Sequence, residues 1–207
     1  MQHHSRSLWV IFSILLIDTM GFGMVIPILP KLVEQMLGGA VAEASTVYGL
    51  LLASFALMSF LFSSVMGALA DRYGRRPVLT LSLFALTIDY VILANAPSIG
   101  WLFLGRIIAG IFSATISVTS AYVADTSVPE KRAANFGFIG VAMGLGLISG
   151  PLVGGSLAVL GARAPFWAAA SLAGVNCVAA YFFLPESLER RHRRRWNRSF
   201  NRLAPWS

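Results

Sequence analysis

Six long apolar runs constrain the fold of this chain more than any other feature of its sequence. A helix needs about 20 apolar residues to cross the hydrocarbon core of a bilayer, which is about 30 Å thick. The segments that meet this requirement are residues 8–29, 48–70, 77–94, 99–123, 136–160 and 166–184. With 57% hydrophobic and 12% charged residues, the chain also lies far from the composition of a soluble domain. The sequence therefore predicts an all-α membrane protein without a β-sheet, in which residues 1–184 form one bundle of six transmembrane helices.

The first apolar run is interpreted as a retained span and not as a cleaved signal peptide. It follows Arg6, as the apolar part of a signal peptide follows a positive charge. It continues past Asp18, however, and shows no small-residue cleavage pattern.

The basic residues between the runs predict the orientation in the membrane. Arg72, Arg75 and Arg76 lie in the second connection, and Lys131 and Arg132 lie in the fourth. The third connection has no basic residue, and the first and fifth have one each. Because Lys and Arg favour cytoplasmic loops, we expect both termini to be cytoplasmic.

Residues 185–207 are predicted to form a basic cytoplasmic linker or tail. Seven of the 16 basic residues of the chain lie between Arg190 and Arg202. Such a run favours contact with the anionic lipid of the bilayer. A nuclear or nucleic-acid address is the alternative, but a chain inserted by six spans has little use for one. We therefore expect no nucleic-acid partner.

Prolines and glycines mark irregular or closely packed places within the spans. Pro27 and Pro151 fall inside spans and are expected to kink or interrupt them. Gly146, Gly150 and Gly154 are spaced by four and share one helix face, which predicts close contact with a neighbouring helix. That face either serves packing alone or also allows helices to rock along it.

Three charged residues lie near the middle of the membrane. At about 1.5 Å per residue, Asp18 is about 15 Å and Asp89 about 18 Å from the cytoplasmic ends of their helices. Arg106 is about 10 Å from the outer end of the fourth span. Charges at this depth are costly and are by default candidates for function. The three side chains are expected to meet in the bundle interior.

Burial and ion pairing act on these carboxyl groups in opposite directions. Burial disfavours the charged form of a carboxyl group, whereas a nearby guanidinium favours it. If Arg106 pairs with one acid, the other remains able to exchange a proton or to bind a cation. In the alternative, Arg106 and one aspartate form a fixed pair that only selects the packing of the bundle.

Other chemistry finds little support in the sequence. His3, His4 and His192 lie outside the spans, so no intramembrane histidine is present for a hydrolase, a metal cluster or a haem. The G-x-x-x-x-G-K-[ST] phosphate-binding pattern is absent. Cys177 is interpreted as a small packing residue. We expect neither an enzyme nor a resident cofactor, and we expect energy to come from an ion gradient.

The segment GALADRYGRR, residues 67–76, resembles the loop between spans two and three of the major facilitator superfamily. Gly67 is expected to permit close helix packing and Gly74 a tight turn. Asp71, Arg72 and Arg75 are expected to form ion pairs that close the cytoplasmic side. Asp125, at the cytoplasmic end of the fourth span, is the expected partner of Arg75.

Further motifs resemble the drug/proton antiporters of that superfamily. Gly105, Arg106 and Gly110 resemble its fourth-span R-x-x-x-G motif, and the stretch GLISGPLVGG resembles its fifth-span G-P-x-x-G-G motif. The residues of the latter are Gly146, Gly150, Pro151, Gly154 and Gly155. The segments LLIDTMGFGMVIPILP, LTIDYVILANAP and FFLPES are similar to tetracycline/proton antiporters.

This resemblance implies exchange of a metal–tetracycline cation for a proton across the inner membrane of a bacterium. Asp18, Asp89 and Arg106 match the membrane-embedded charges of that family, and magnesium would arrive with the drug. Family members have twelve spans in two halves, with the binding cavity between them. This chain corresponds to the N-terminal half. We expect it to be incomplete without a C-terminal half or a second bundle, and a truncated frame is favoured over a homodimer.

Two questions stay open at this point. The motifs do not identify the cargo, so a transporter of another small amphiphilic substrate and a non-transporting assembly subunit remain alternatives. The hydroxyl groups of the fourth span can either face a cavity or bond back to their own helix. These residues are Ser113, Thr115, Ser117 and Thr119.

Overall fold

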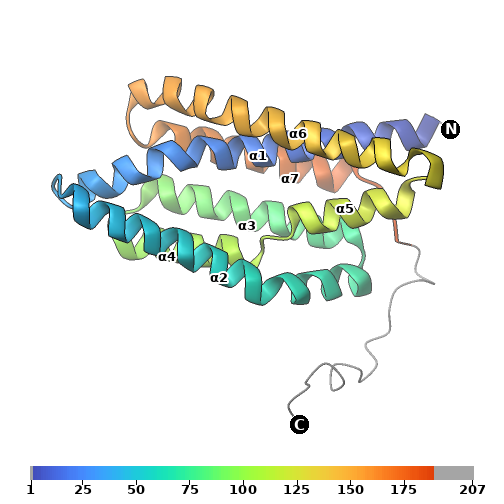
Figure 1. Ribbon diagram of the computed structural model, residues 1–207, viewed down its shortest axis with the longest axis horizontal. Helices are drawn as coiled ribbons and strands as arrows, with labels where there is room; N and C mark the ends of the chain where they lie inside the picture. The colour runs from blue at the N-terminus through green and yellow to red at the C-terminus, as the bar shows by residue number, and fades with distance from the viewer. Residues whose placement is uncertain (1, 189–207) are drawn as a thin grey trace, which may run out of the picture.

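The computed structural model describes residues 2–188 of the chain, and every regular element within them is helical. The helices lie side by side along the long axis of the molecule (Figure 1). They are α1 (Gln2–Met36), α2 (Val41–Tyr73), α3 (Arg75–Asn95), α4 (Ile99–Ile111), α5 (Thr115–Thr126), α6 (Pro129–Leu157), the short 3-10 helix η1 (Ala158–Leu160) and α7 (Ala164–Phe183). The predicted all-α fold is confirmed. Residues 189–207 of the predicted tail lie outside the described residues.

Six helical segments among the described residues are long and apolar enough to cross a membrane, as predicted. The fourth combines α4 and α5, and the fifth runs from α6 through η1. Several helices extend beyond the apolar runs. The first continues to Met36, and α2 begins at Val41, because backbone hydrogen bonding continues into the more polar residues that flank each span.

The bundle is organised around α1 and α3. The helix α1 packs against α6 and α7, whereas α3 packs against α7 and α4, and α2 packs against α4. Buried apolar residues form two clusters. One contains Ile14 and Leu15 of α1, and the other contains Met24 of the same helix. Asp18 lies between these positions, so α1 carries its carboxylate at the boundary between the two apolar clusters.

The basic connections gather at one end of the molecule. Figure 1 shows the N-terminal end of α1, the α2–α3 turn and the α5–α6 turn at the same end. Arg75 and Lys131 lie there. Gly74 makes the α2–α3 turn with φ +113°, a conformation that favours glycine, as the sequence predicted. The arrangement agrees with the predicted topology, and its assignment to the cytoplasm stays a prediction.

The fourth span is broken, although the sequence predicted one continuous helix there. The chain leaves helical geometry at Phe112–Ala114, between α4 and α5. The amide of Ser113 bonds to the Gly110 carbonyl, and the amide of Ala114 bonds to the Phe112 carbonyl. The Ser117 hydroxyl donates to the carbonyl of Ala114 at 3.0 Å. Local bonds of this kind allow non-helical backbone at membrane depth where it lines a cavity.

The internal prolines do not interrupt their helices. The helix α1 continues through Pro27, and α6 continues through Pro151. Interruption was one of the two outcomes predicted for these residues, and it is wrong. Neighbouring helices can support the backbone around a proline inside a membrane bundle.

Candidate functional site

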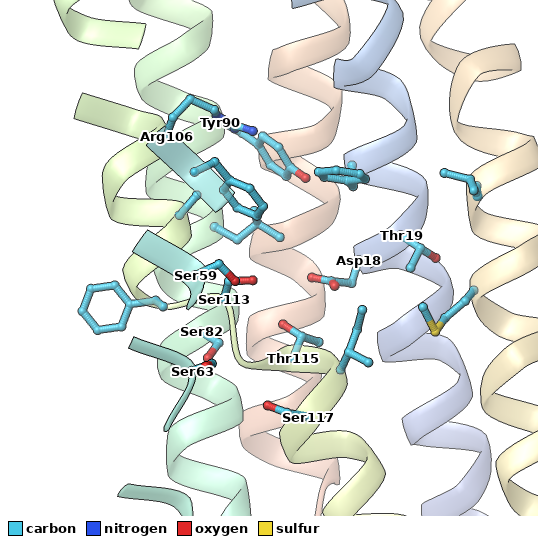
Figure 2. A pocket seen from close by; sticks show the side chains of 18 of the residues that line it. Asp18, Thr19, Ser59, Ser63, Ser82, Tyr90, Arg106, Ser113, Thr115 and Ser117 are labelled. Carbon is cyan, nitrogen blue, oxygen red and sulfur yellow. The ribbon is translucent and has the colours of Figure 1, made fainter. Parts of the chain in front are cut away.

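A cavity of about 620 Å³ lies inside the bundle at the level of Asp18. Residues from α1 to α6 form its walls, and the α4–α5 break contributes Ser113. The wall combines aromatic rings with hydroxyl groups, and Figure 2 labels the hydroxyl-bearing side chains. The aromatic residues are Phe22, Phe55, Tyr90 and Phe112, and the hydroxyl-bearing residues are Thr19, Ser59, Ser63, Ser82, Ser113, Thr115 and Ser117. Apolar surface with a few polar groups is typical of a site for an amphiphilic small molecule.

Asp89 and Arg106 form an ion pair between α3 and α4. The Asp89 side chain is fully buried, and that of Arg106 is 3% exposed. Arg106 also lies 5.9 Å from the centroid of the Phe55 ring. A Cβ atom at Gly105 would lie 2.6 Å from Oδ1 of Asp89, so only glycine leaves room for this carboxylate. The arginine is thus compensated within the wall of the cavity.

Asp18 lines the same cavity but does not share the ion pair. Its side chain is half-buried, and its Oδ1 atom is buried without a hydrogen-bond partner. Figure 2 shows the carboxylate directed across the cavity, with Thr115 beside it. Among the described residues no cation forms a salt bridge with it. Two of the three predicted charges, Asp18 and Arg106, therefore line one cavity, and Asp89 neutralises Arg106.

The broken fourth span presents a helix N-terminus near this carboxylate. The first helical bond of α5 runs from the amide of Val118 to the carbonyl of Ala114. The amides of Thr115 to Ser117 precede that bond, and such amides give a helix N-terminus a partial positive charge. Thr115 and Ser117 both line the cavity, as does Ser113. Thr119 is buried elsewhere, and its hydroxyl lacks a partner. Ser117 therefore both lines the cavity and bonds back to the carbonyl of Ala114, whereas Thr119 does neither.

Tyr90 is a polar group of the site that sequence reasoning missed. Its side chain is buried, and its hydroxyl lacks a hydrogen-bond partner. The hydroxyl lies against Gly21, where a Cβ atom would be 3.1 Å away, one turn beyond Asp18. A tyrosine inside an apolar run resembles a core residue, and its position directly after Asp89 was the available signal. Ser59 and Ser63 of α2 were also missed, because a single polar residue in an apolar run gives no sign that it lines a cavity.

The predicted gating residues form an ion-pair network at the end of the bundle that holds the basic turns. Arg75 bonds to Asp71 at 2.6 Å and, through Nε, to Asp125 at 3.2 Å. The predicted pairing of Arg75 with Asp125 is confirmed. Arg72 stacks over the ring of Tyr73, with 5.1 Å between the guanidinium carbon and the ring centroid.

A residue after the last span joins this network. The carboxylate of Glu186 accepts a hydrogen bond from the backbone amide of Arg75 at 2.8 Å. It therefore contacts the first residue of α3, where helix amides lack partners within the helix. The segment FFLPES contains Glu186, but the resemblance of this segment to a family did not predict the contact.

The predicted glycine face brings α6 close to α1. A Cβ atom at Gly150 would lie 2.5 Å from the carbonyl oxygen of Met20, and one at Gly154 would lie 3.0 Å from Cα of Met24. Gly146 meets Thr19 in the same way. Pro151 packs near Gly23, with its Cδ 3.2 Å from where a Cβ would stand.

Two other glycines have open surroundings. No heavy atom lies within 4 Å of a Cβ atom built at Gly67 or at Gly155. The predicted close packing at Gly67 is wrong, because this face of α2 has no neighbouring helix beside it. The backbone contact of α6 is confined to one face of that helix.

The sequence matches the Major Facilitator Superfamily over residues 11–207. It is 43% identical to the class C tetracycline resistance protein of Escherichia coli over 200 residues, which are 97% of this chain and 50% of that protein. It is 39% identical to the class B protein of Escherichia coli over 174 residues, which are 84% of this chain and 43% of that protein. The chain spans about half the length of these relatives.

Solved structures show the same architecture. The chain matches the human organic anion transporter MFSD10 (TETRAN) with a TM-score of 0.80 and 28% identity, covering 92% of this chain and 50% of that one. It matches a peptide transporter, POT, with a TM-score of 0.74 and 18% identity, which supports the fold alone.

The apolar helices, the cavity and these matches define a multi-pass membrane protein of transporter type. The chain belongs to the major facilitator superfamily. Its length corresponds to one of the two halves of such a transporter. The similarity to tetracycline resistance proteins, predicted from the motifs, is confirmed.

Proposed function

We propose that this chain is the N-terminal half of a proton-coupled tetracycline exporter in the inner membrane of a bacterium, with both termini in the cytoplasm. The names of its relatives support the substrate, and the cavity supports the mechanism. A volume of about 620 Å³ lies in the range of small-molecule sites, which is about 300–1,000 Å³. A lining of aromatic rings and hydroxyl groups suits a planar drug that carries many oxygen atoms.

The single observation that carries the mechanism is that only one of the two aspartates has an ion partner. Asp89 is compensated by Arg106, whereas Asp18 faces the cavity without an ion partner. A carboxylate in this position binds either a proton or a cationic substrate, but not both at once. Mutual exclusion at Asp18 is sufficient for exchange of one proton for one monovalent drug–metal cation, which leaves the net charge unchanged. Magnesium enters as part of that cargo.

Opening and closing require a movable connection between helices. The Arg75 network joins the turn after α2 to the end of α5, and we assign it the role of the cytoplasmic gate. The glycine face of α6 offers a close and smooth contact along which α1 can rock. Because the binding cavity of such transporters lies between two halves, the second half supplies the opposite wall.

A substrate of opposite charge is the main competing function, since MFSD10 is named as an organic anion transporter. The cavity argues against it for this chain. Arg106, the cation in the cavity wall, is already paired with Asp89, whereas the unpaired charge at Asp18 is negative. A cationic or metal-chelated substrate fits this balance better.

Drug export by the assembled transporter tests the proposal. The chain is expressed in Escherichia coli together with the half of the class C relative that it does not match, and tetracycline accumulation is measured. We expect lowered accumulation, lost in Asp18→Asn and retained in Glu34→Gln, which changes an acidic residue of α1 outside the cavity. Normal export by Asp18→Asn contradicts the role of this carboxyl group. Export of another amphiphile without tetracycline contradicts the substrate.

A further inference from the structure

Asn176 is a buried amide in the last membrane helix, away from the cavity. Its side chain is 1% exposed, and Nδ2 donates a hydrogen bond to the backbone carbonyl of Ile14 at 2.9 Å. The bond therefore joins α7 to α1. An amide inside an apolar helix is costly unless it is hydrogen-bonded, so its position on this carbonyl is specific.

The carbonyl that Asn176 contacts belongs to the helical turn that ends at Asp18. In an α-helix the carbonyl of residue 14 accepts the amide of residue 18, so Ile14 and Asp18 share one turn of α1. The bond from Asn176 therefore fixes the backbone that carries the carboxylate. From another side, Gly146 of α6 lets its helix approach this turn closely, because a Cβ atom there would lie 2.6 Å from the carbonyl oxygen of Leu16. The turn is thus held by α7 and by α6.

We propose that Asn176 is a positioning residue for Asp18: by anchoring the Ile14 carbonyl, it holds the carboxylate at the wall of the cavity. This inference rests on the proposed role of Asp18 in proton exchange. The side chain of Asn176 does not line the cavity and touches neither proton nor drug. Its effect passes through the backbone of α1. Displacement of a reacting group by about 1 Å lowers rates about a hundredfold in enzymes, and a transporter that positions an exchanging carboxyl group is subject to the same requirement.

A positioning role differs from simple adhesion between helices. Arg163 also bonds to a backbone carbonyl of another segment, that of Ala96, at 3.0 Å. It lies in the α6–α7 connection, and its bond does not involve α1. Loss of either bond weakens the bundle, but only loss of the Asn176 bond releases the Asp18 turn. Arg163→Leu is therefore the matched control.

The test measures access to Asp18 without any drug. The 207-residue chain is reconstituted in phosphatidylethanolamine and phosphatidylglycerol vesicles and treated with dicyclohexylcarbodiimide, which modifies buried carboxyl groups. Mass spectrometry then gives the labelling rates of Asp18 and Asp89 in each variant. Asp89 serves as the internal reference, because it is fully buried and paired on α3.

We expect Asn176→Leu to raise the labelling of Asp18 about threefold, the population change expected for loss of an average interhelical hydrogen bond in a membrane. Labelling of Asp89 should stay unchanged, and Arg163→Leu should leave both rates unchanged. An unchanged or lowered rate at Asp18, or an equal rise at both acids, overturns the inference. If Asn176→Leu does not fold, Asn176→Ser removes the amide with a smaller change in volume, and the same outcomes apply.

Labelling also separates this inference from the proposed function. A selective rise at Asp18 supports the positioning role even when the assembled transporter exports no tetracycline, in which case the proposed substrate is wrong. If export depends on Asp18 but the labelling rate of Asp18 is the same with and without Asn176, the transport proposal stands and the positioning role is wrong.

Discussion

Arg106 on α4 pairs with Asp89 on α3, and both side chains are buried inside the bundle. Each charge therefore depends on the other. Two charges taken from water together are tolerated, whereas one left alone in the interior is costly. Because Arg106 pairs with Asp89, it does not pair with Asp18, and the Asp18 carboxylate lines the cavity without an ion partner.

Removal of one member of the pair should therefore destabilise the protein more than removal of both. We expect Asp89→Asn to cost about 3–5 kcal/mol, because it leaves a buried guanidinium without compensation. Asp89→Asn combined with Arg106→Met should recover most of that loss. Thermal unfolding in detergent measures both variants. Equal destabilisation by the single and the double variant would show that the charges do not depend on each other.

Gly105 should be intolerant of a methyl group. A Cβ atom there would lie 2.6 Å from the Asp89 carboxylate, so Gly105→Ala must displace the ion pair, and overpacking of this kind costs about 1–3 kcal/mol. Gly67→Ala is the matched control, because its surroundings are open and alanine favours the helix. The unfolding temperatures of the two variants test this difference in stability. An unfolding temperature of Gly105→Ala equal to that of the unchanged protein would refute the close contact.

The glycine face of α6 should be sensitive at one position and tolerant at another. Gly150→Ala places a methyl group 2.5 Å from the Met20 carbonyl and should separate α6 from α1, with loss of drug export by the assembled transporter. Gly155→Ala lies on the open face of the same helix and should keep export. Tetracycline accumulation in cells distinguishes them. Export that survives in both variants would remove the proposed rocking contact.

The Arg75 network should influence gating more than stability. Arg75 and Asp125 are partly exposed, so their pair contributes no more than about 1 kcal/mol to folding. We expect Asp125→Asn to raise the reaction of a cysteine placed at Ser117 with a water-soluble maleimide added from the cytoplasmic side. A cysteine at Ser59 on α2 gives a second reporter in the cavity. Unchanged reactivity at both positions would limit these residues to setting the topology.

The sequence was sufficient to predict the number of spans, but it was not sufficient to predict where a helix is broken within a span. Six apolar runs require six helices, since a bilayer leaves the backbone few alternatives. The break at Phe112–Ala114 was not predictable, because serine and threonine hydroxyl groups support both a continuous and a broken helix. Proline was the stronger signal for a break, yet α1 passes through Pro27 without one.

The residues of the charged site were predictable from the sequence, but their pairing was not. Counting residues along each helix places Asp18, Asp89 and Arg106 at similar levels. Which acid meets the arginine depends on how the helices are rotated about their axes, and a sequence leaves that rotation open. Tyr90 and Asn176 stayed hidden because a single polar group in an apolar run resembles a packing residue until its neighbours are known.

Proton release on drug binding tests the role of Asp18 most directly. Purified assembled transporter in a weakly buffered solution is mixed with magnesium and tetracycline, and the pH change is recorded with a dye and corrected for chelation in solution. We expect about one proton per bound drug, absent in Asp18→Asn and retained in the variant that lacks both Asp89 and Arg106 charges. Drug binding with undiminished proton release in Asp18→Asn would contradict exchange at this carboxyl group.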